Sequence, residues 1–220
     1  MTNVGIYIPA RLGSTRLKEK MLLDVKGTPL IRVMYDNVSS FGYPTKVVTD
    51  SEKIAAVLPE GSYFMSGEAE NGTARIASVL DQIPHDLIIN VQGDMLGITK
   101  EVVDRMVNDY STPSFEFCAV GYKKGYPKGG VKILHQNGHA IWFTRSEIGY
   151  GDQTLGIYAY KRVVLQQYHL LKGCDDKKED LEQCRIINFF PMRAIEVPFK
   201  GIEVDFKKDL KKIKEVVGSS

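Results

Sequence analysis

Positively charged and hydroxyl-bearing side chains gather near the N-terminus, where they could bind a polyphosphate. Arg11, Arg16 and Lys20 follow one another closely, and Ser14 and Thr15 lie between the two arginines. An arginine can hold two phosphate oxygens at once, and a lysine adds a mobile positive charge. The GxxxxGK[ST] spacing of a P-loop is absent. These residues favour phosphate binding, and a solvated basic turn is the alternative that residue types alone leave open.

The carboxylate of Asp94 is a second candidate for chemistry. It follows Gln92 and Gly93, directly after the apolar run 87–91. Such a run predicts a strand buried on both faces of a parallel sheet. Ligands of open α/β sheets bind beyond the carboxyl ends of the strands, so Asp94 is placed where chemistry tends to occur. The alternative is an aspartate that only shapes a turn after glycine.

Strands and helices that alternate along the first half of the chain would position these side chains. We expect strands at residues 4–8 and 87–91, with Pro9 ending the first of them. After the basic stretch, Thr28 should cap a helix that has Pro29 at its first position. Strands alternating with helices are typical of a parallel α/β sheet.

The second half of the chain adds a hairpin and a further strand. Asn137 and Gly138 give the strongest short hairpin signal, and apolar residues flank them on both sides. We expect Trp142, in the second arm, to belong to the core because aromatic side chains usually do. Residues 193–197 should form an outer strand.

Composition restricts the class of protein. The chain has 220 residues, 43% hydrophobic and 25% charged, with a net charge of +2. These are ordinary values for a globular protein and give no general drive toward nucleic acid or membrane surfaces. Three cysteines without CxxC spacing indicate neither a disulfide framework nor a zinc site. This cysteine usage fits a reducing cytoplasm best, and we expect a soluble protein because no secretion signal or membrane-spanning run is visible.

Several stretches resemble those of a known enzyme family. Residues 8–23 read IPARLGSTRLKEKMLL and resemble the signature IPAR..STRLPGKPLL of the cytidylyltransferases that activate acidic sugars, most closely the CMP-Kdo synthetases. Kdo is 3-deoxy-manno-octulosonate. Matches continue in NGTAR, INVQGDML, AIWFTRSEI, TLGIYAY, EDLEQCRII and IEVDFKKDL, the last against xGVDTPEDL. The resemblance therefore covers nearly the whole chain.

The resemblance implies a fold and a reaction. The fold is α/β, a Rossmann-like, mostly parallel sheet with flanking helices of the nucleotide-diphospho-sugar transferase type. One domain would span residues 1–217, with a hairpin lobe around 123–160 and a tail at 218–220. The reaction is CTP plus Kdo to CMP-Kdo and pyrophosphate, with Mg²⁺ as the cofactor. A homodimer is also implied, whereas nucleic acid and membranes are not partners.

The resemblance also assigns roles by position. Catalytic roles go to Arg16, Lys20 and Asp94. Nucleotide contacts go to Ala10, Arg11, Ser14, Thr73, Arg75 and Gln92. Sugar contacts go to Lys132, Arg145, Thr154, Tyr158, Glu182 and Gln183. The metal ligands would be Asp94 and Asp205, since magnesium takes one or two carboxylates together with substrate phosphates and water.

The chain departs from the family pattern at several positions. Thr154 stands where the family has a sugar-binding histidine, and the segment between Arg145 and Leu155 is much shorter than usual. Met95 and Phe206 also replace family residues. These departures keep two alternatives open. One is a synthetase for another acid sugar, such as amino-Kdo, a sialic acid or a pseudaminic acid, and the other is a catalytically silent nucleotide-binding protein.

Overall fold

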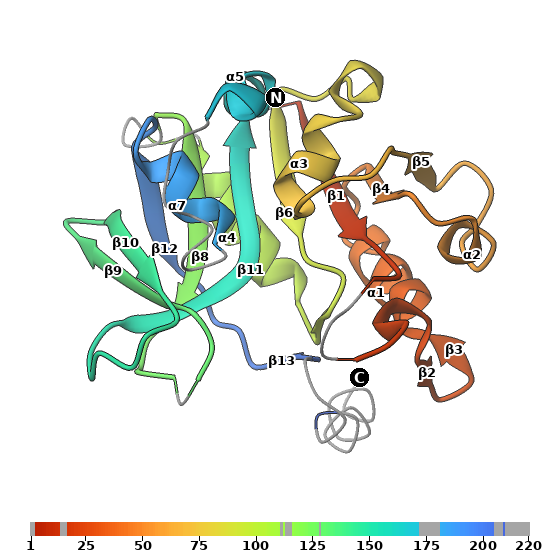
Figure 1. The fold of residues 1–220 in the computed structure, drawn as a ribbon, viewed down its shortest axis with the longest axis horizontal. Coiled ribbons are helices and arrows are strands. Elements are labelled where there is room, and N and C mark those ends of the chain that lie inside the picture. The colour runs from red at the N-terminus through yellow and green to blue at the C-terminus, as the bar shows by residue number, and fades with distance from the viewer. Residues whose placement is uncertain are drawn as a thin grey trace.

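One nine-stranded sheet organises the chain (Figure 1). The structure is a computed structural model that describes residues 3–13, 17–110, 112, 116–127, 129–171, 181–204 and 209. The strands lie in the order β5-β4-β1-β6-β11-β8-β12-β10-β9. Their bounds are β1 Val4–Ala10, β4 Thr45–Thr49, β5 Tyr63–Met65, β6 Leu87–Val91, β8 Cys118–Lys123, β9 Lys132–Gln136, β10 His139–Thr144, β11 Asp152–Lys161 and β12 Met192–Glu196.

Helices and short ribbons complete the described part of the fold. The α-helices are α1 Leu30–Ser39, α2 Glu52–Ala55, α3 Gly72–Ala77, α4 Lys100–Tyr110, α5 Arg162–Gln167 and α7 Glu182–Ile187. Single 3-10 turns are η1 Lys20–Leu22, η2 Leu80–Gln82 and η3 Tyr168–Leu170. Two small ribbons pair β2 Asp24–Val25 with β3 Thr28–Pro29, and β7 Met95–Leu96 with β13 Ile202–Glu203. None of these described helices has the length and apolar character needed to cross a bilayer.

The predicted α/β class is confirmed, and the sheet is mixed. Strands β5, β4, β1 and β6 run parallel to one another, as the strand and helix alternation predicts. Beyond β6, β11 is antiparallel to both β6 and β8, and β10 is antiparallel to β12 and β9. The hairpin β9–β10 therefore continues the main sheet. The single domain over residues 1–217 and its separate lobe stay predictions.

Helices cover both faces of the sheet and enclose two apolar layers (Figure 1). Leu87, Ile89 and Val91 of β6 pack with α1 and α4 on one face. Ile88, on the opposite face of the same strand, packs with α3, α5 and α7. Because successive side chains of a strand point to opposite faces, a continuous apolar run is what this position requires. Bounds of 87–91 for this strand are confirmed.

Two of the expected boundaries are wrong because pairing within the fold overrides the local signal. Strand β1 continues through Pro9 to Ala10, both paired with β4. The backbone nitrogen of Pro9, which carries no hydrogen, faces β6. Pairing with β6 ends at Tyr7, so the sheet loses no hydrogen bond at Pro9. Thr28 does not cap α1, because it pairs with Val25 in the β2–β3 ribbon, and Pro29 is the N-cap residue.

The hairpin is confirmed, whereas two expectations about its surroundings are wrong. Asn137 and Gly138 have φ values of 53° and 76°, as a type I′ turn requires. Strand β12 is not an outer strand, because it lies between β8 and β10. Trp142 is 40% exposed and outside the core. A register shift between Ala140 and Trp142 turns Phe143 inward instead.

The close approach of β13 to β7 gives a stability prediction. A Cβ atom at Gly201 would overlap the carbonyl oxygen of Leu96 and lie 2.7 Å from the Phe199 ring. Gly201→Ala should therefore lower the free energy of unfolding by about 1–3 kcal/mol, the usual cost of overpacking. Urea denaturation measures this change. Gly67→Ala is the matched control because no atom lies within 4 Å of its added Cβ. Equal stabilities of the two variants would contradict the packing described here.

Candidate active site

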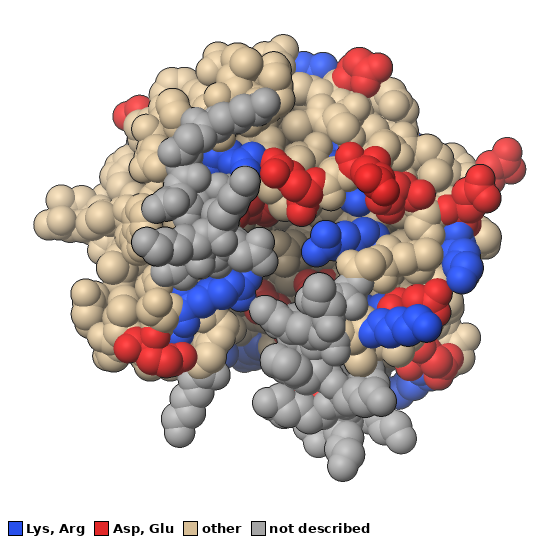
Figure 2. Space-filling view, in the orientation of Figure 1, with Lys and Arg blue, Asp and Glu red and all other residues tan. Residues whose placement is uncertain are grey.

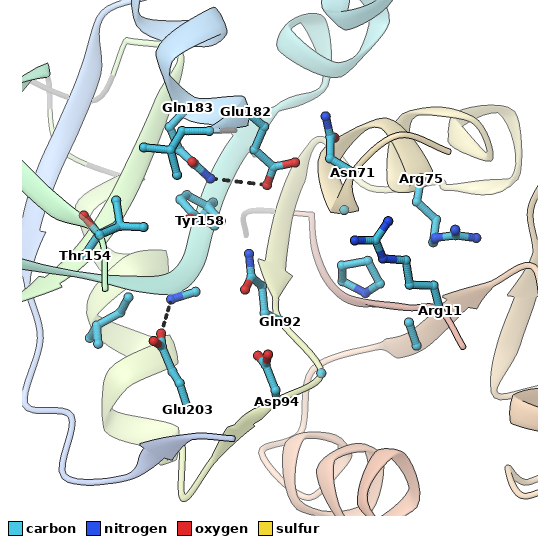
Figure 3. Close-up of a pocket in the computed structure, with 18 of the residues that line it drawn as sticks. Arg11, Asn71, Arg75, Gln92, Asp94, Thr154, Tyr158, Glu182, Gln183 and Glu203 are labelled. Atoms are coloured by element: carbon cyan, nitrogen blue, oxygen red, sulfur yellow. Dashed lines mark hydrogen bonds between the residues drawn. The ribbon is translucent and has the colours of Figure 1, made fainter. Parts of the chain in front are cut away.

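A cavity of about 440 Å³ opens beyond the carboxyl ends of β1 and β6. Its walls come from the loop after β1, the start of α3, the turn after β6, the middle of β11 and the start of α7. Figure 2 shows the hollow in the middle of this face, with Lys and Arg side chains on both sides and acidic side chains along its upper rim. Figure 3 shows that labelled polar side chains point into it from both halves of the molecule.

Lys20 and Asp94 form an ion pair in this cavity. The distance from Lys20 Nζ to Asp94 Oδ2 is 2.5 Å, and the two side chains are only 12% and 15% exposed. Glu19, immediately before η1, has a positive φ of 50° and turns the chain so that Lys20 begins the 3-10 turn. Gly93 lets the turn after β6 come close to η1, since a Cβ at this position would lie 2.9 Å from Met21 Sδ. Local structure thus joins the two predicted catalytic residues.

The second oxygen of Asp94 suits a divalent metal ion. Asp94 Oδ1 is buried and has no hydrogen-bond partner among the described residues. A buried carboxylate oxygen without a partner is costly, and Mg²⁺ prefers this kind of hard oxygen ligand. Val204 donates its N–H to the Asp94 carbonyl oxygen at 3.0 Å, which brings the end of β13 to the same turn. Asp205, the predicted second ligand, lies outside the described residues.

Arginine and backbone groups line the half of the cavity next to β1 and α3. Ala10, Arg11 and Gly13 line it from the loop after β1, and Gln92 lines it from the end of β6. Arg11 is exposed and reaches toward the start of α3 (Figure 3). The other predicted residues of this basic loop, Ser14 and Arg16, lie outside the described residues.

Arg75 also lines the cavity, but the protein holds its guanidinium firmly. Its side chain donates to Asp50 Oδ2 at 2.8 Å and to Ser66 Oγ at 2.7 Å, and the residue is 2% exposed. Thr73 is fully buried and is not among the residues that line the cavity. Its hydroxyl lies 3.2 Å from the Tyr160 hydroxyl. The structure therefore brings Arg75 to the site and places Thr73 behind its wall.

Glu182 links the two halves of the cavity wall. Its Oε2 accepts the N–H of Thr73 at 3.1 Å, and its Oε1 accepts a hydrogen bond from Gln183 Nε2 at 3.2 Å (Figure 3). Burial raises the pKa of the Glu182 carboxyl, and the hydrogen bonds from Thr73 partly oppose this rise. Glu182 and Gln183, for which the family resemblance implies sugar contacts, both line the cavity. The pair thus ties α7 to the start of α3.

Three more predicted residues line the half formed by β10 and β11. Arg145, Thr154 and Tyr158 all face the cavity. Burial raises the pKa of the Tyr158 phenol well above its ordinary value, and the nearby charges of Glu182 and Glu203 raise it further. The phenol therefore stays protonated and can donate a hydrogen bond. Thr154 is 6% exposed, and its hydroxyl has no hydrogen-bond partner among the described residues.

Lys132 is not among the residues that line this cavity. Its side chain is fully buried, and its Nζ lies 2.9 Å from Glu147 Oε1 and 3.1 Å from the Arg145 carbonyl oxygen. Its ammonium group also lies over the ring of Tyr126. The geometry indicates that Lys132 holds the segment around Arg145 in place.

The sequence analysis missed several lining residues, of which Glu203 carries a charge close to Asp94. Glu203 Oε1 accepts the N–H of Gly156 at 3.1 Å. The sequence does mark Glu203 as unusual, because it occupies the glycine position of the family pattern xGVD. Arg185 was also missed, and it forms an ion pair with Glu70 across the rim of the cavity.

Sequence comparisons relate this chain to known proteins. The family model described as Cytidylyltransferase matches residues 5–217. A 3-deoxy-manno-octulosonate cytidylyltransferase of Escherichia coli is 31% identical over 238 residues, covering 99% of this chain and 97% of the relative. An 8-amino-3,8-dideoxy-manno-octulosonate cytidylyltransferase of Shewanella baltica is 31% identical over 239 residues, covering 97% and 98%.

A solved structure is similar over almost the full length. It is that of CMP:2-keto-3-deoxy-manno-octonic acid synthetase complexed with CTP, with a TM-score of 0.89 and 29% identity, covering 99% of each chain. A glucose-1-phosphate thymidylyltransferase structure from Bacillus anthracis has a TM-score of 0.74 at 17% identity, covering 97% of this chain and 94% of the other, and shows likeness of fold alone.

Proposed function

Because the chain belongs to the cytidylyltransferase family, we propose that it transfers the cytidylyl group of CTP to an acidic sugar of the Kdo type. The products are a CMP-sugar and pyrophosphate, and the reaction depends on Mg²⁺. Relatives named for Kdo and for its 8-amino form both match nearly the whole chain. Kdo is therefore the first substrate to test, and the amino sugar is the second.

The ion pair of Lys20 with Asp94 is the observation that carries this proposal. It lies between a wall bearing Arg11 and Arg75 and a wall bearing Arg145 and Tyr158. The first wall suits a nucleoside triphosphate, because guanidinium groups match phosphate oxygens. The second suits a sugar acid, whose carboxylate Arg145 can bind in the same way. Phosphoryl transfer needs aligned reactants and neutralised charge more than covalent help from the protein.

The residues of the nucleotide half bind and orient the triphosphate. Arg11 holds phosphate oxygens, and the N–H groups near Gly13 and Gly72 are close enough to the cavity to add further donors. Lys20 neutralises charge on the departing pyrophosphate. Asp94, together with Asp205, would hold Mg²⁺, and its buried Oδ1 fits that role. When bound, the metal polarises the α-phosphate and lowers the pKa of the attacking hydroxyl.

The residues of the sugar half place the anomeric hydroxyl for attack on the α-phosphorus. Arg145 binds the sugar carboxylate, and the protonated Tyr158 donates to a sugar oxygen. The Glu182 carboxylate accepts hydrogen bonds from sugar hydroxyls, and the Gln183 amide donates hydrogen bonds to them. The hydrogen bond between the two side chains fixes their positions. The hydroxyl oxygen forms a bond to the α-phosphorus, and the bond from the α-phosphorus to the bridging oxygen of the β-phosphate breaks. Pyrophosphate leaves, and the proton of the hydroxyl passes to solvent.

Release of pyrophosphate tests the proposal. We expect purified protein with CTP, Mg²⁺ and Kdo, or its 8-amino form, to release one pyrophosphate for each CMP-sugar formed. Removal of Mg²⁺ with EDTA should reduce the rate to background, and added Mg²⁺ should restore it. No release with any acidic sugar would overturn the transferase function and favour a catalytically silent nucleotide-binding protein. Release with ATP at the same rate would overturn the choice of CTP.

Two further parts of the proposal concern the setting of the protein. We expect it to act in the cytoplasm, where CTP is made, and to form a homodimer. Ile141 and Trp142, which are 54% and 40% exposed on β10, offer an apolar surface that a second copy could cover. Light scattering coupled to size-exclusion chromatography measures the mass in solution. A mass of 24.7 kDa at micromolar concentration would contradict the dimer.

A further inference from the structure

We propose that Tyr126 and Glu147 are positioning residues for the acidic sugar, because together with Lys132 they fix the backbone of Arg145. We call these three side chains the Arg145 clasp. The inference rests on the proposed cytidylyltransferase function and deepens it, since Arg145 binds the carboxylate of the sugar there. None of the three residues lines the cavity, so they act on the sugar only through Arg145.

Lys132, at the start of β9, is held between two neighbouring strands. It pairs with Thr144 of β10 on one side and with Gln153 of β11 on the other (Figure 1). Gly151 lets the chain enter β11 this close to β9, because a Cβ at this position would lie 3.1 Å from the Ile133 carbonyl oxygen. The side chain of Lys132 is fully buried. Packing therefore restricts where its ammonium group can lie.

Two hydrogen bonds fix the peptide group that follows Arg145. Lys132 Nζ donates to the Arg145 carbonyl oxygen at 3.1 Å. The N–H of Ser146, in the same peptide group, donates to Thr144 Oγ1 at 3.0 Å, and Thr144 is buried at the end of β10. Arg145 lines the cavity directly after that strand. Lys132 and Thr144 thus set the direction from which the Arg145 side chain leaves the backbone.

Glu147 compensates the buried charge of Lys132. The distance from Lys132 Nζ to Glu147 Oε1 is 2.9 Å. A buried ammonium group without a partner carries a large desolvation cost. Hydrogen bonds from Tyr126 and then from Lys132 lower the pKa of the Glu147 carboxyl, so it is charged at neutral pH. Without this carboxylate, the ammonium group would gain by moving toward water, away from the Arg145 carbonyl oxygen.

Tyr126 orients the Glu147 carboxylate. The Tyr126 hydroxyl donates to Glu147 Oε2 at 2.6 Å and accepts the N–H of Gly149 at 3.2 Å. The Lys132 ammonium lies 5.5 Å from the centre of the Tyr126 ring, a favourable cation–π distance. The Glu147 side chain is 63% exposed, so without the hydroxyl it would regain its freedom to change rotamer. One hydroxyl thus ties together Glu147 and Gly149.

The clasp lies in the part of the chain that departs most from the family pattern. The segment between Arg145 and Leu155 is much shorter than usual, and it contains both Glu147 and Gly149. A short segment has few residues with which to pack against itself. Side-chain hydrogen bonds to Tyr126 and Lys132 give it fixed contacts instead.

Steady-state kinetics with both substrates tests the clasp. Tyr126→Phe keeps the ring and removes the hydroxyl, and Glu147→Gln keeps the size of the side chain and removes its charge. Each should raise the KM for the sugar that is turned over, Kdo or its 8-amino form, by about tenfold, because misplacing a group by about 1 Å can cost up to about 10²-fold. The KM for CTP should stay within about twofold. An equal rise in both KM values would overturn the clasp, because the two residues would then serve the fold as a whole.

Two matched controls and a double variant complete this test. Tyr150→Phe, in the same segment, and Glu101→Gln, on α4, change exposed side chains and should leave both KM values unchanged. Lys132→Met removes the buried charge that Glu147 compensates. Adding Glu147→Gln to Lys132→Met should therefore raise the KM for the sugar no further, since residues in one network are not additive. Effects that multiply would overturn the clasp.

Calorimetry separates this inference from the proposed function. Without Mg²⁺ and with CTP present, the sugar should bind Tyr126→Phe about tenfold more weakly than the wild type, whereas CTP should bind both equally well. If no acidic sugar is turned over but this loss of affinity holds, the transferase function fails and the clasp stands. Turnover with an unchanged KM for the sugar in both variants overturns the clasp and leaves the function intact. A wild type that neither binds nor turns over an acidic sugar overturns both.

Discussion

Asp94→Asn should lower kcat/KM with CTP and the acidic sugar by roughly 10³-fold or more. Asparagine keeps the size of the side chain but loses the charge that faces Lys20 and the oxygen that fits Mg²⁺. Charge stabilisation in a water-poor site is often the largest single contribution to catalysis, and the loss of one such group costs about 10²–10³ in rate. Loss of a metal ligand adds to this. The loss should be in kcat, measured as pyrophosphate release under saturating CTP.

Nucleotide affinity is the second measurement on this variant. Without Mg²⁺, CTP binding by Asp94→Asn should stay within about tenfold of the wild type, because the arginine contacts to the triphosphate remain and each contact adds only modest affinity. Asp81→Asn is the matched control, since Asp81 is exposed in η2, away from the cavity. A wild-type rate in Asp94→Asn, with the control unchanged, would remove Asp94 from the reaction.

The sequence predicted the centre of the fold well because burial leaves a strong pattern there. Strand β6 lies between β1 and β11 with helices on both faces, so each of its positions from Leu87 to Val91 is buried. Most of these positions are apolar, and the run ends where the cavity begins. The hairpin turn was equally clear, since positive φ at two successive positions needs residues such as Asn137 and Gly138.

Edges and element boundaries were less predictable because they depend on partners distant in the sequence. Pro9 is tolerated in β1 only because β6 has already stopped pairing at that level. Thr28 is a good helix-cap residue when its sequence is considered alone, but in the structure its backbone pairs with β2 instead. Strand β12 enters the interior of the sheet between β8 and β10, an order that no local pattern encodes.

The predicted site residues divide according to whether another protein group already satisfies them. Lys20 and Asp94 are 74 positions apart, and the fold brings them together as the family pattern implies. Thr73 and Lys132 fit the same pattern, but other residues already bind them. The N–H of Thr73 donates to Glu182, and the ammonium of Lys132 donates to Glu147. Competing partners of this kind come from elsewhere in the chain, so residue type and spacing cannot reveal them. Glu203 was overlooked for a different reason, because a glutamate near a predicted metal ligand looks like an ordinary surface charge.

Lys20→Met should lower kcat by about 10²-fold or more, with a smaller rise in the KM for CTP. Methionine matches the unbranched stem of lysine and lacks its charge. Lys20 is close to Asp94 in the free protein, and its positive charge is most valuable when charge builds up on the departing pyrophosphate, an effect on the order of 10²–10³ in rate. Lys18→Met, exposed in the same loop, is the matched control. A KM effect without a kcat effect would mean that Lys20 only binds the nucleotide.

The double variant Lys20→Met with Asp94→Asn tests whether the two residues act as one unit. Groups that stabilise the same transition state are strongly non-additive, so the double variant should lose about as much as Asp94→Asn alone, on the order of 10³-fold. Independent action would instead multiply the two losses to about 10⁵-fold.

The free energy of unfolding gives a second test of the pair. Asp94→Asn leaves the mostly buried ammonium of Lys20 without this carboxylate, and Lys20→Met relieves that cost, so the double variant should be more stable than Asp94→Asn. Multiplied rate losses together with additive stabilities would show that the pair seen here has no joint role.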